Sequence, residues 1–597
     1  MSPEPQPIER KPLAFPPFQV EVDRRADGTT VLRNSLGGPD ATCTLPQRLA
    51  HWAARTPAQL FLSEPLEGGG RRTLRYDIAQ EKVTSLAARL LNLPLGRDRP
   101  LLIVGDNSIE QALLILAAMT VGQPAAIVSP AYAGQSARPW TKFKLVVDTL
   151  TPGAILANDP AGVHLAIGSG SGWKGEVLPI RPDQSLQKVN PSSWQDVERA
   201  ARRQDLDVPS KLLFTSGSTG TPKAVINSQR MMVSNMLAIG EVWPFLKHTP
   251  PTLVDWLPWN HTFGGNFCFN LALWYGGTLH IDAGRPSPAL IGQTVEALRR
   301  YPPTAYFNVP AGFDALLPIF ERDRAFAERF FGRLDFLFNA GAALPVSTRE
   351  RLDAVASKVA GRAIPLLGAW GSTETAPCST ILCFDTAVPG NLGVPLPGTE
   401  IKLVPMRDRA EIRVRGPNVM PGYWRAPVES KAAFDKEGFF RTGDAAQLAD
   451  PQRPEAGLVF GGRIAENFKL LSGTWVNAGQ VRLAAIAATQ PFVSDAVVTG
   501  EGQHELGVLL FLNADACGTE DRTGVRRSIA DRLAALNADR NGSSMRIARF
   551  EILDEPPSAV QGEITDKGYL NQRAILDRRA DAVTQLYADP RAVIVAP

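Results

Sequence analysis

The chain has 597 residues, a formal net charge of +3 and 44% hydrophobic residues. This length suggests more than one domain, and the interspersed charges contain no basic run that would indicate a nucleic acid partner. No apolar run reaches the roughly 18 residues of a membrane span, and the polar, Pro-rich N-terminal stretch has no signal-peptide core. Five scattered cysteines without a C-x-x-C pair indicate reduced thiols. We therefore expect a cytoplasmic protein with no membrane partner, present as a monomer or homodimer.

The first elements in chain order are a hairpin and then a long α/β region. Residues 18–34 begin with alternating apolar residues and centre on Asp27-Gly28, a turn signal for a β-hairpin. From about residue 75, buried runs such as 100–105 and 124–130 alternate with helical stretches. This alternation predicts parallel sheets covered on both faces. Because ligands bind beyond the carboxyl ends of such strands, we expect several loops to converge on one site.

A hydroxyl-rich loop follows the apolar run at 212–214, in the stretch "LLFTSGSTGTPKAV". It is not the phosphate loop of nucleotide hydrolases, because Pro222 replaces the required glycine and Ala224 replaces the Ser or Thr that would follow Lys223. Backbone amides, hydroxyls and one ammonium still suit a nucleotide phosphate, whereas the alternative is a polar surface turn. The predicted phosphate-binding residues are Thr215, Ser216, Gly217, Ser218, Thr219, Gly220, Thr221 and Lys223.

The sequence pattern changes after about residue 390, where short predicted strands separated by turns indicate a β-rich module. Mixed strands and helices follow Arg463. We therefore predict an α/β protein with two domains. Residues 1–462 would form a large N-terminal domain of parallel α/β subdomains and the β-rich module, and residues 463–597 a small α+β C-terminal domain.

Three further stretches carry residues suited to activating a carboxylic acid with ATP, a reaction that needs cations and oriented amides around two anions. "LPWNHTFGG" contains His261, "GAWGSTETAP" contains Trp370 and Glu374, and "FRTGDAAQL" contains Asp444. An indole can lie on adenine, one carboxylate can hold Mg²⁺ and the other can accept ribose hydroxyls. Taken one at a time, each is equally a core or turn residue.

The order of these motifs resembles the adenylate-forming superfamily: "TSGSTGTPK", "NHTFGG", "NAGAALP", "WGSTE", "RGPNVMPGYW", "FRTGD", "GR" and a late lysine. Within it, the chain is most similar to feruloyl-CoA synthetases, through "LPWNHTFGGNFCFN", "GGTLHID", "GAWGSTETAP", "GRIAENFKLLSGTWVNAGQVR" and "GEITDKGYLNQRA". The resemblance implies a mobile C-terminal domain and a two-step reaction through an acyl-AMP. It also implies ATP, Mg²⁺, CoA and a small aromatic acid, such as the hydroxycinnamate ferulic acid, as ligands.

The resemblance also implies a role for each matching residue. For the nucleotide, Lys223 and the loop before it clamp phosphates, Thr373 reaches the α-phosphate and Glu374 binds Mg²⁺. Asp444 and Arg463 hold the ribose. The remaining nucleotide-site residues, around adenine and the acyl end, are Gly341, Ala342, Ala343, Trp370, Gly371 and Ser372.

For the acid and for CoA, the implied residues lie in both domains. His261 would gate the acyl end, and the acid-binding set is His261, Phe263, Asn266, Asn308 and Ala340. Lys567 would be the catalytic lysine of adenylation. Lys469 and Gly473 would face the pantetheine channel during thioester formation, where a glycine allows close approach of the thiol arm.

Three departures from the family pattern lie in the C-terminal segment. Ala465 replaces the charged residue at the domain pivot, and Glu563 follows the glycine that a lysine normally follows, which leaves Lys567 as the nearest match. "VNAGQVR" also differs from the usual wording, at Ala478, Gln480 and Arg482. Two alternatives to a CoA ligase remain: an acyl-AMP ligase that serves a carrier protein or amine, and a degenerate sensor of nucleotide or acyl-CoA.

Overall fold

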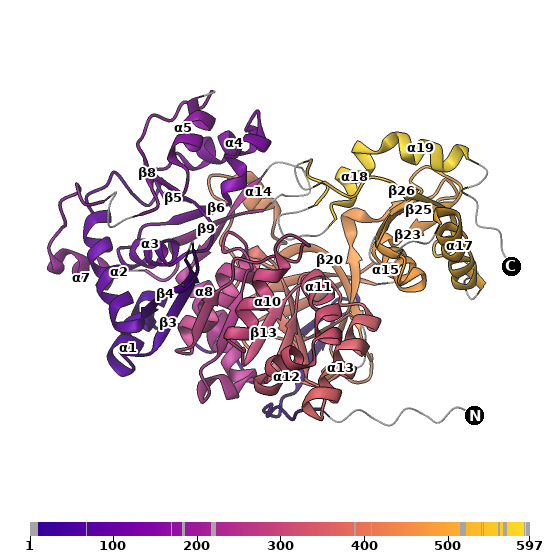
Figure 1. The fold of residues 1–597 in the computed structure, drawn as a ribbon, viewed down its shortest axis with the longest axis horizontal. Helices are drawn as coiled ribbons and strands as arrows, with labels where there is room; N and C mark the ends of the chain where they lie inside the picture. Colours follow the sequence, from indigo (N-terminus) through magenta and orange to yellow (C-terminus); the bar gives the residue numbers. More distant parts are fainter. Residues whose placement is uncertain are drawn as a thin grey trace.

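The computed structural model describes most of the chain. The described residues are 10–66, 68–168, 170–181, 186–203, 205–215, 222–386, 388, 390–406, 409–513, 517, 521–538, 540, 542–558, 561–564, 570–589 and 592. Figure 1 shows a large N-terminal part and a smaller C-terminal part beside it. The predicted α/β class, with a large N-terminal domain and a smaller C-terminal domain, is confirmed.

The first large sheet carries the hydroxyl-rich loop at its edge. Its order is β10 (Lys223–Ser228), β9 (Pro209–Thr215), β6 (Ala125–Val128), β5 (Leu101–Val104), β7 (Ala154–Ala157) and β8 (Val177–Pro179). All pairs are parallel except β9 with β10. The neighbouring helices are α2 (Tyr76–Leu90), α3 (Ile109–Thr120), α4 (Thr141–Leu150), α5 (Pro160–Gly168) and α7 (Trp194–Arg202). Every residue of β5, β6 and β7 is buried, as expected for a parallel sheet covered on both faces.

The second sheet has 11 strands and joins the β-rich module to the α/β region. Its order is β1 (Val20–Arg24), β2 (Thr30–Asn34), β18 (Glu400–Pro405), β19 (Ala410–Arg415), β20 (Phe440–Leu448), β21 (Leu458–Arg463), β17 (Asn391–Pro395), β16 (Cys378–Ile381), β15 (Leu366–Gly371), β14 (Phe336–Asn339) and β13 (Ala305–Asn308). The predicted hairpin at Asp27-Gly28 is confirmed, since β1 and β2 pair antiparallel. β13, β14 and β15 are parallel, so their carboxyl ends meet at one edge.

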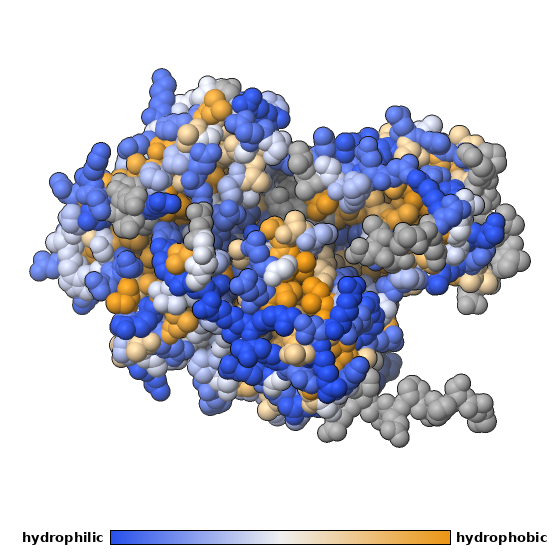
Figure 2. Space-filling view, in the orientation of Figure 1, coloured by the Kyte–Doolittle hydropathy of each residue, from blue (hydrophilic) through white to orange (hydrophobic). Residues whose placement is uncertain are grey.

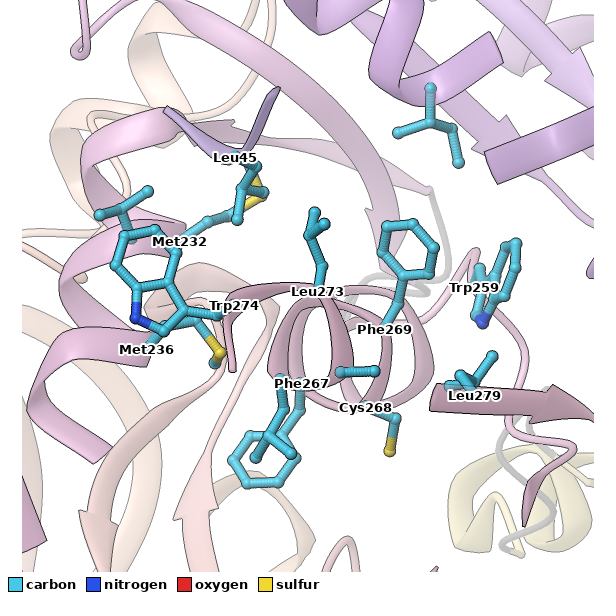
Figure 3. Close-up of a cluster of buried hydrophobic side chains, with 14 of the residues drawn as sticks. Leu45, Met232, Met236, Trp259, Phe267, Cys268, Phe269, Leu273, Trp274 and Leu279 are labelled. Atoms are coloured by element: carbon cyan, nitrogen blue, oxygen red, sulfur yellow. The ribbon is translucent and has the colours of Figure 1, made fainter. Parts of the chain in front are cut away.

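A four-stranded sheet completes the N-terminal part, in the order β11 (Thr252–Asp255), β12 (Thr278–Ile281), β3 (Leu60–Pro65) and β4 (Arg71–Arg75). Its core includes α1 (Leu45–Arg55), α8 (Gln229–Val242) and α9 (Phe269–Trp274). Figure 3 shows Phe269 and Leu273 of α9 on one side of the helix, and Phe267 and Cys268, in the π-helical turn that leads into α9, on the other. That helix is therefore buried on both sides. The helices α10 (Ile291–Arg300), α11 (Pro310–Arg322), α12 (Arg324–Arg333), α13 (Val346–Ala360) and α14 (Pro427–Ala432) lie farther along the chain.

The C-terminal part has its own core beside a three-stranded sheet of β24 (Val493–Thr499), β25 (Leu506–Leu512) and β26 (Ile547–Leu553). The helices are α15 (Ala478–Thr489), α17 (Arg522–Ala538), α18 (Gln572–Arg578) and α19 (Ala580–Ala588), and a short hairpin pairs β22 (Phe468–Lys469) with β23 (Trp475–Val476). The face in Figure 2 mixes hydrophilic and hydrophobic areas on both parts. None of the described helices is long and apolar enough to cross a membrane.

Candidate active site

The β9–β10 hairpin brings the two ends of the hydroxyl-rich loop together. Thr215, the last residue of β9, pairs with Lys223, the first residue of β10. β9 lies parallel to β6, so this loop leaves the carboxyl edge of the sheet. The predicted residues Ser216, Gly217, Ser218, Thr219, Gly220 and Thr221 lie outside the described residues. The described geometry therefore places the base of the loop, including its lysine.

Tyr423 connects the lysine of this loop with the predicted metal-binding carboxylate. The Nζ atom of Lys223 lies 5.2 Å from the centre of the Tyr423 ring. The Tyr423 hydroxyl donates a hydrogen bond of 3.3 Å to Oε1 of Glu374. Burial, reinforced by the Glu374 charge, raises the pKa of Tyr423, so the hydroxyl stays protonated and remains a donor. Tyr423 lies within the motif "RGPNVMPGYW", but motif reasoning assigned it no role.

Glu374 occupies the short helical turn η5 (Thr373–Thr375), directly after β15. Its side chain is half-buried, while Thr373 beside it is buried. Among the described residues, no group of three or more His, Cys, Asp or Glu side chains could hold a metal ion. Mg²⁺ is commonly held by one or two carboxylates together with substrate phosphates, so a single accessible carboxylate fits an ion shared with ATP.

Trp370, Asp444 and Arg463 form a second linked group. The indole Nε1 of Trp370, on β15, donates a hydrogen bond of 3.0 Å to Oδ2 of Asp444. Asp444 on β20 pairs with Arg463 on β21, and the Arg463 Nε atom lies 3.5 Å from Oδ1 of Asp444. Gly371 and Ser372 link Trp370 directly to η5. The two linked groups therefore meet at the carboxyl end of β15, the edge at which β13 and β14 also end.

The loop after β14 lies at the same edge. Asn339 ends β14, and its Nδ2 atom donates to the Ala342 carbonyl at 2.8 Å. The backbone N–H of Ala340 donates to the Asn308 carbonyl at 3.3 Å, which ties the loop to β13. Gly341 is exposed, and Ala342 and Ala343 are half-buried. The structure thus brings the predicted 340–343 loop next to the strand that carries Trp370.

A π-helix, η4 (Phe263–Cys268), begins two residues after His261 and continues into α9. π-turns are rare and frequently occur at functional sites. A Cβ atom at position 265 would lie 2.3 Å from the Trp259 carbonyl oxygen, so only glycine fits there. The Phe263 ring lies 5.7 Å from that of Phe338 on β14, which places the π-helix against the α/β end of the 11-stranded sheet.

Two of the predicted acid-binding amides are engaged with the protein. Asn266 is fully buried, and its Nδ2 atom donates to Asn227 Oδ1 at 2.8 Å and to Thr262 Oγ1 at 3.1 Å. Asn308 donates to the Tyr306 hydroxyl at 2.8 Å and accepts from the N–H of Val309. Both amides have their partners inside the protein, and their role as acid ligands stays a prediction.

The predicted CoA-side residues lie on the short hairpin of the C-terminal part. The Lys469 Nζ atom lies 5.1 Å from the centre of the Trp475 ring, and the two residues pair across β22 and β23. Gly473 is in the turn, with a φ of +81°. Ala465, at the expected pivot, is exposed in the short turn η7 (Ile464–Glu466). Lys567 lies outside the described residues.

Glu563 has a structural explanation for its departure from the family pattern. Its side chain is fully buried, and it accepts two hydrogen bonds of 2.7 Å from Arg579 and one of 2.8 Å from the Ser558 N–H. Arg579 holds the pKa of this carboxyl at about 2. Motif reasoning missed Arg579, because the two residues are 16 positions apart and no pattern links them.

Solved structures share this fold across nearly the whole chain. ATP-bound MatB from Rhodopseudomonas palustris has a TM-score of 0.68 at 21% identity, covering 90% of this chain and 99% of its own. The adenylation domain of a carboxylate reductase from Mycobacterium chelonae has a TM-score of 0.71 at 17% identity, covering 92% of both chains. These likenesses establish the adenylation-type fold.

The chain belongs to the AMP-binding enzyme family. The sequence model of that family matches residues 49–424, and the AMP-binding enzyme C-terminal domain matches residues 468–591. Anthranilate–CoA ligase of Pseudomonas aeruginosa is 29% identical over 430 residues, which cover 70% of this chain and 76% of that protein. Mitochondrial malonate–CoA ligase of Mus musculus is 25% identical over 364 residues, which cover 54% of this chain and 58% of that protein. The match thus spans little more than half of the mouse relative.

Proposed function

We propose that this protein is an AMP-forming acid–CoA ligase. The observation that carries the proposal is the meeting of two linked groups at the carboxyl end of β15, Lys223–Tyr423–Glu374 and Trp370–Asp444–Arg463. One group offers an ammonium and a carboxylate for phosphates and their metal ion, and the other offers an indole and a carboxylate for a nucleoside. The similarity to CoA ligases acting on malonate, anthranilate and fatty acids supports CoA as the acyl acceptor.

In this proposal, the acid's carboxylate attacks the α-phosphate of ATP and pyrophosphate leaves, so an acyl-AMP forms. The CoA thiolate then attacks the acyl carbon and AMP leaves. Bound Mg²⁺ neutralises phosphate charge. Lys223 holds the leaving phosphates, while Asp444, oriented by Trp370 and Arg463, holds the ribose. Preorganised charges of this kind lower the barrier because they need no rearrangement during the reaction.

The expected nucleotide products are AMP and pyrophosphate. The hydroxyl-rich loop lacks the Walker pattern of enzymes that release ADP, since Pro222 and Ala224 occupy two required positions. Chromatography of reactions containing ATP, Mg²⁺, CoA and a panel of acids identifies the products. ADP as the nucleotide product would contradict the proposal, and an acyl-AMP that never becomes a CoA thioester would favour delivery to a carrier protein or amine.

For the acid, we propose a hydroxycinnamate such as ferulic or p-coumaric acid. The support is the sequence stretch "WNHTFGGNFCFN" and the half-buried Phe263, whose ring packs on the buried Phe267 and Phe338 and would form the acid-binding wall. An apolar surface with a few polar groups suits a planar acid. We expect a higher kcat/KM for ferulic or p-coumaric acid than for C12–C16 fatty acids. Steady-state kinetics over a panel that includes malonate and anthranilate measures this. A fatty acid with a higher kcat/KM than every hydroxycinnamate would contradict it.

We also expect Tyr423 to tune the metal and phosphate ends of the site separately. Tyr423→Phe removes only the hydrogen bond to Glu374, and we expect it to raise the Mg²⁺ concentration for half-maximal activity about threefold to tenfold. Tyr423→Leu also removes the aromatic ring that Lys223 contacts, so we expect it to raise the KM for ATP in addition to the Mg²⁺ concentration for half-maximal activity. Tyr587→Phe is the matched control, since that hydroxyl donates to the Glu505 carbonyl in the C-terminal part. If Tyr423→Phe and Tyr587→Phe have the same Mg²⁺ dependence, Tyr423 has no such role.

A further inference from the structure

Lys211 is a lysine in the interior of the N-terminal part. It lies on β9, is 1% exposed, and is followed by the fully buried Leu212 and Leu213. Its Nζ atom donates to the Gly265 carbonyl oxygen at 2.9 Å and to Asn266 Oδ1 at 3.0 Å. Both acceptors belong to the π-helix η4. A cation of the first sheet is thus bonded directly to the turn that follows His261.

The bonds continue beyond the π-helix. Asn266 Nδ2 donates to Asn227 Oδ1 on β10, and the Asn227 amide donates to the Val225 carbonyl at 3.2 Å. Asn266 also donates to Thr262, the residue between His261 and Phe263. One buried network therefore joins the π-helix to β9 and β10, the two strands that flank the predicted phosphate loop.

This arrangement is costly for stability alone. Removing an ammonium from water carries a large penalty, and Lys211 has amide and carbonyl acceptors as its hydrogen-bond partners. Burial lowers the pKa of Lys211 to about 7. An apolar side chain would fill the same space without that penalty. The Lys211 amine is therefore best explained by its two acceptors, the Gly265 carbonyl and the Asn266 side chain, which belong to the π-helix η4.

We propose that Lys211 is a positioning residue that holds the π-turn through Gly265 and Asn266, so that His261 and Phe263 face the acid. Lys211 does not itself touch the substrate in this proposal. The inference deepens the proposed function and rests on it for the identity of the acid-binding wall. The contact of Phe263 with Phe338 and of Phe267 with Phe307 is the link to the strands β14 and β13.

The test compares Lys211→Met, which keeps the length and loses the donors, with Lys402→Met. Lys402 is also buried, on β18, but pairs with Asp435 and Glu437 in the β-rich module. We expect Lys211→Met to raise the KM for the acid about tenfold or more and to change the KM for ATP less than about threefold. Lys402→Met is expected to lower the melting temperature without raising the KM for the acid more than the KM for ATP. Lys211→Arg is expected to have a lower KM for the acid than Lys211→Met.

Hydrogen exchange of the backbone amides of residues 261–270, measured without substrate, tests the positioning independently of catalysis. We expect faster exchange there in Lys211→Met than in wild type or Lys402→Met. A smaller change is expected in Asn227→Leu, which loses the bonds to Asn266 and Val225 but keeps those of Lys211. Unchanged exchange in Lys211→Met overturns the positioning role. Faster exchange with an unchanged KM for the acid shows that the π-turn is not the acid-binding wall. Should Lys211→Met fail to fold, Lys211→Gln, which keeps a polar end but is too short to reproduce both bonds of the lysine, decides by the same two measurements.

Discussion

Lys567→Ala is expected to slow formation of acyl-AMP from acid and ATP about 10²–10³-fold, the usual effect of losing a preorganised charge stabiliser. It should still convert presynthesised feruloyl-AMP and CoA to the thioester at a near-normal rate. The reason is that only the first step brings two anions together. Rapid-quench measurement of each half-reaction checks this. Equal slowing of both, or of neither, would mean that the lysine is misassigned or that the C-terminal domain does not alternate.

Gly473→Trp is expected to have the opposite effect on the two half-reactions. A large side chain in the β22–β23 turn should block access of the CoA thiol and leave acyl-AMP formation unchanged. Because the φ of Gly473 is +81°, any residue other than glycine has a strained backbone at this position, whatever the size of its side chain. Gly473→Ala shares that strain without the bulk and is therefore the control. Only if the tryptophan variant loses thioester formation and the alanine variant keeps it does bulk explain the effect.

These half-reactions also test the proposed division of the chain at residue 463. We propose that residues 463–597 move as one small domain between the two steps. Ile564 and Leu570 form a β-bridge, and the buried Glu563 next to Ile564 is held by Arg579. Lys469 and Gly473 lie on a separate hairpin of the same part. A domain rotation could therefore exchange one segment for the other.

Asp444→Ala is expected to lower kcat/KM for ATP about 10²-fold, since a hydrogen bond to a charged group is worth about 1.5–3 kcal/mol and Asp444 would make more than one. Asp444→Asn keeps an acceptor for the Trp370 indole but loses the charge beside Arg463, so we expect a loss of only about tenfold. Initial rates at varied ATP and the affinity for AMP measure both.

The control for Asp444 is Asp450→Ala, which breaks an ion pair with Arg453 at the protein surface. Surface pairs of this kind contribute about 0–1 kcal/mol, so its kinetics should match wild type. An Asp444→Ala variant with the wild-type KM for ATP would remove Asp444 from the nucleotide site.

The amino-acid sequence by itself predicted the α/β class that the structure has, and it supplied the residues that we propose for the nucleotide site. Alternating buried runs and helical stretches predicted the parallel sheets, and the turn at Asp27-Gly28 predicted the β1–β2 hairpin. Trp370, Glu374 and Asp444 were predicted for that site from motifs a few residues long. Such patterns are local, so they can be recognised along the chain without knowing which strands are neighbours.

Only the tertiary structure decided which distant residues meet. Segments far apart in sequence are joined in four places. These are the 11-stranded sheet shared by the β-rich module and the α/β region, the bond from Tyr423 to Glu374, the Glu563–Arg579 pair, and the contact of Lys211 with the π-helix η4. The physical reason is burial: a polar side chain removed from water must find its partner among whatever groups the packed core places beside it. Lys211 is the clearest case, because it lies in a buried strand and both of its acceptors, the Gly265 carbonyl and the Asn266 side chain, belong to η4.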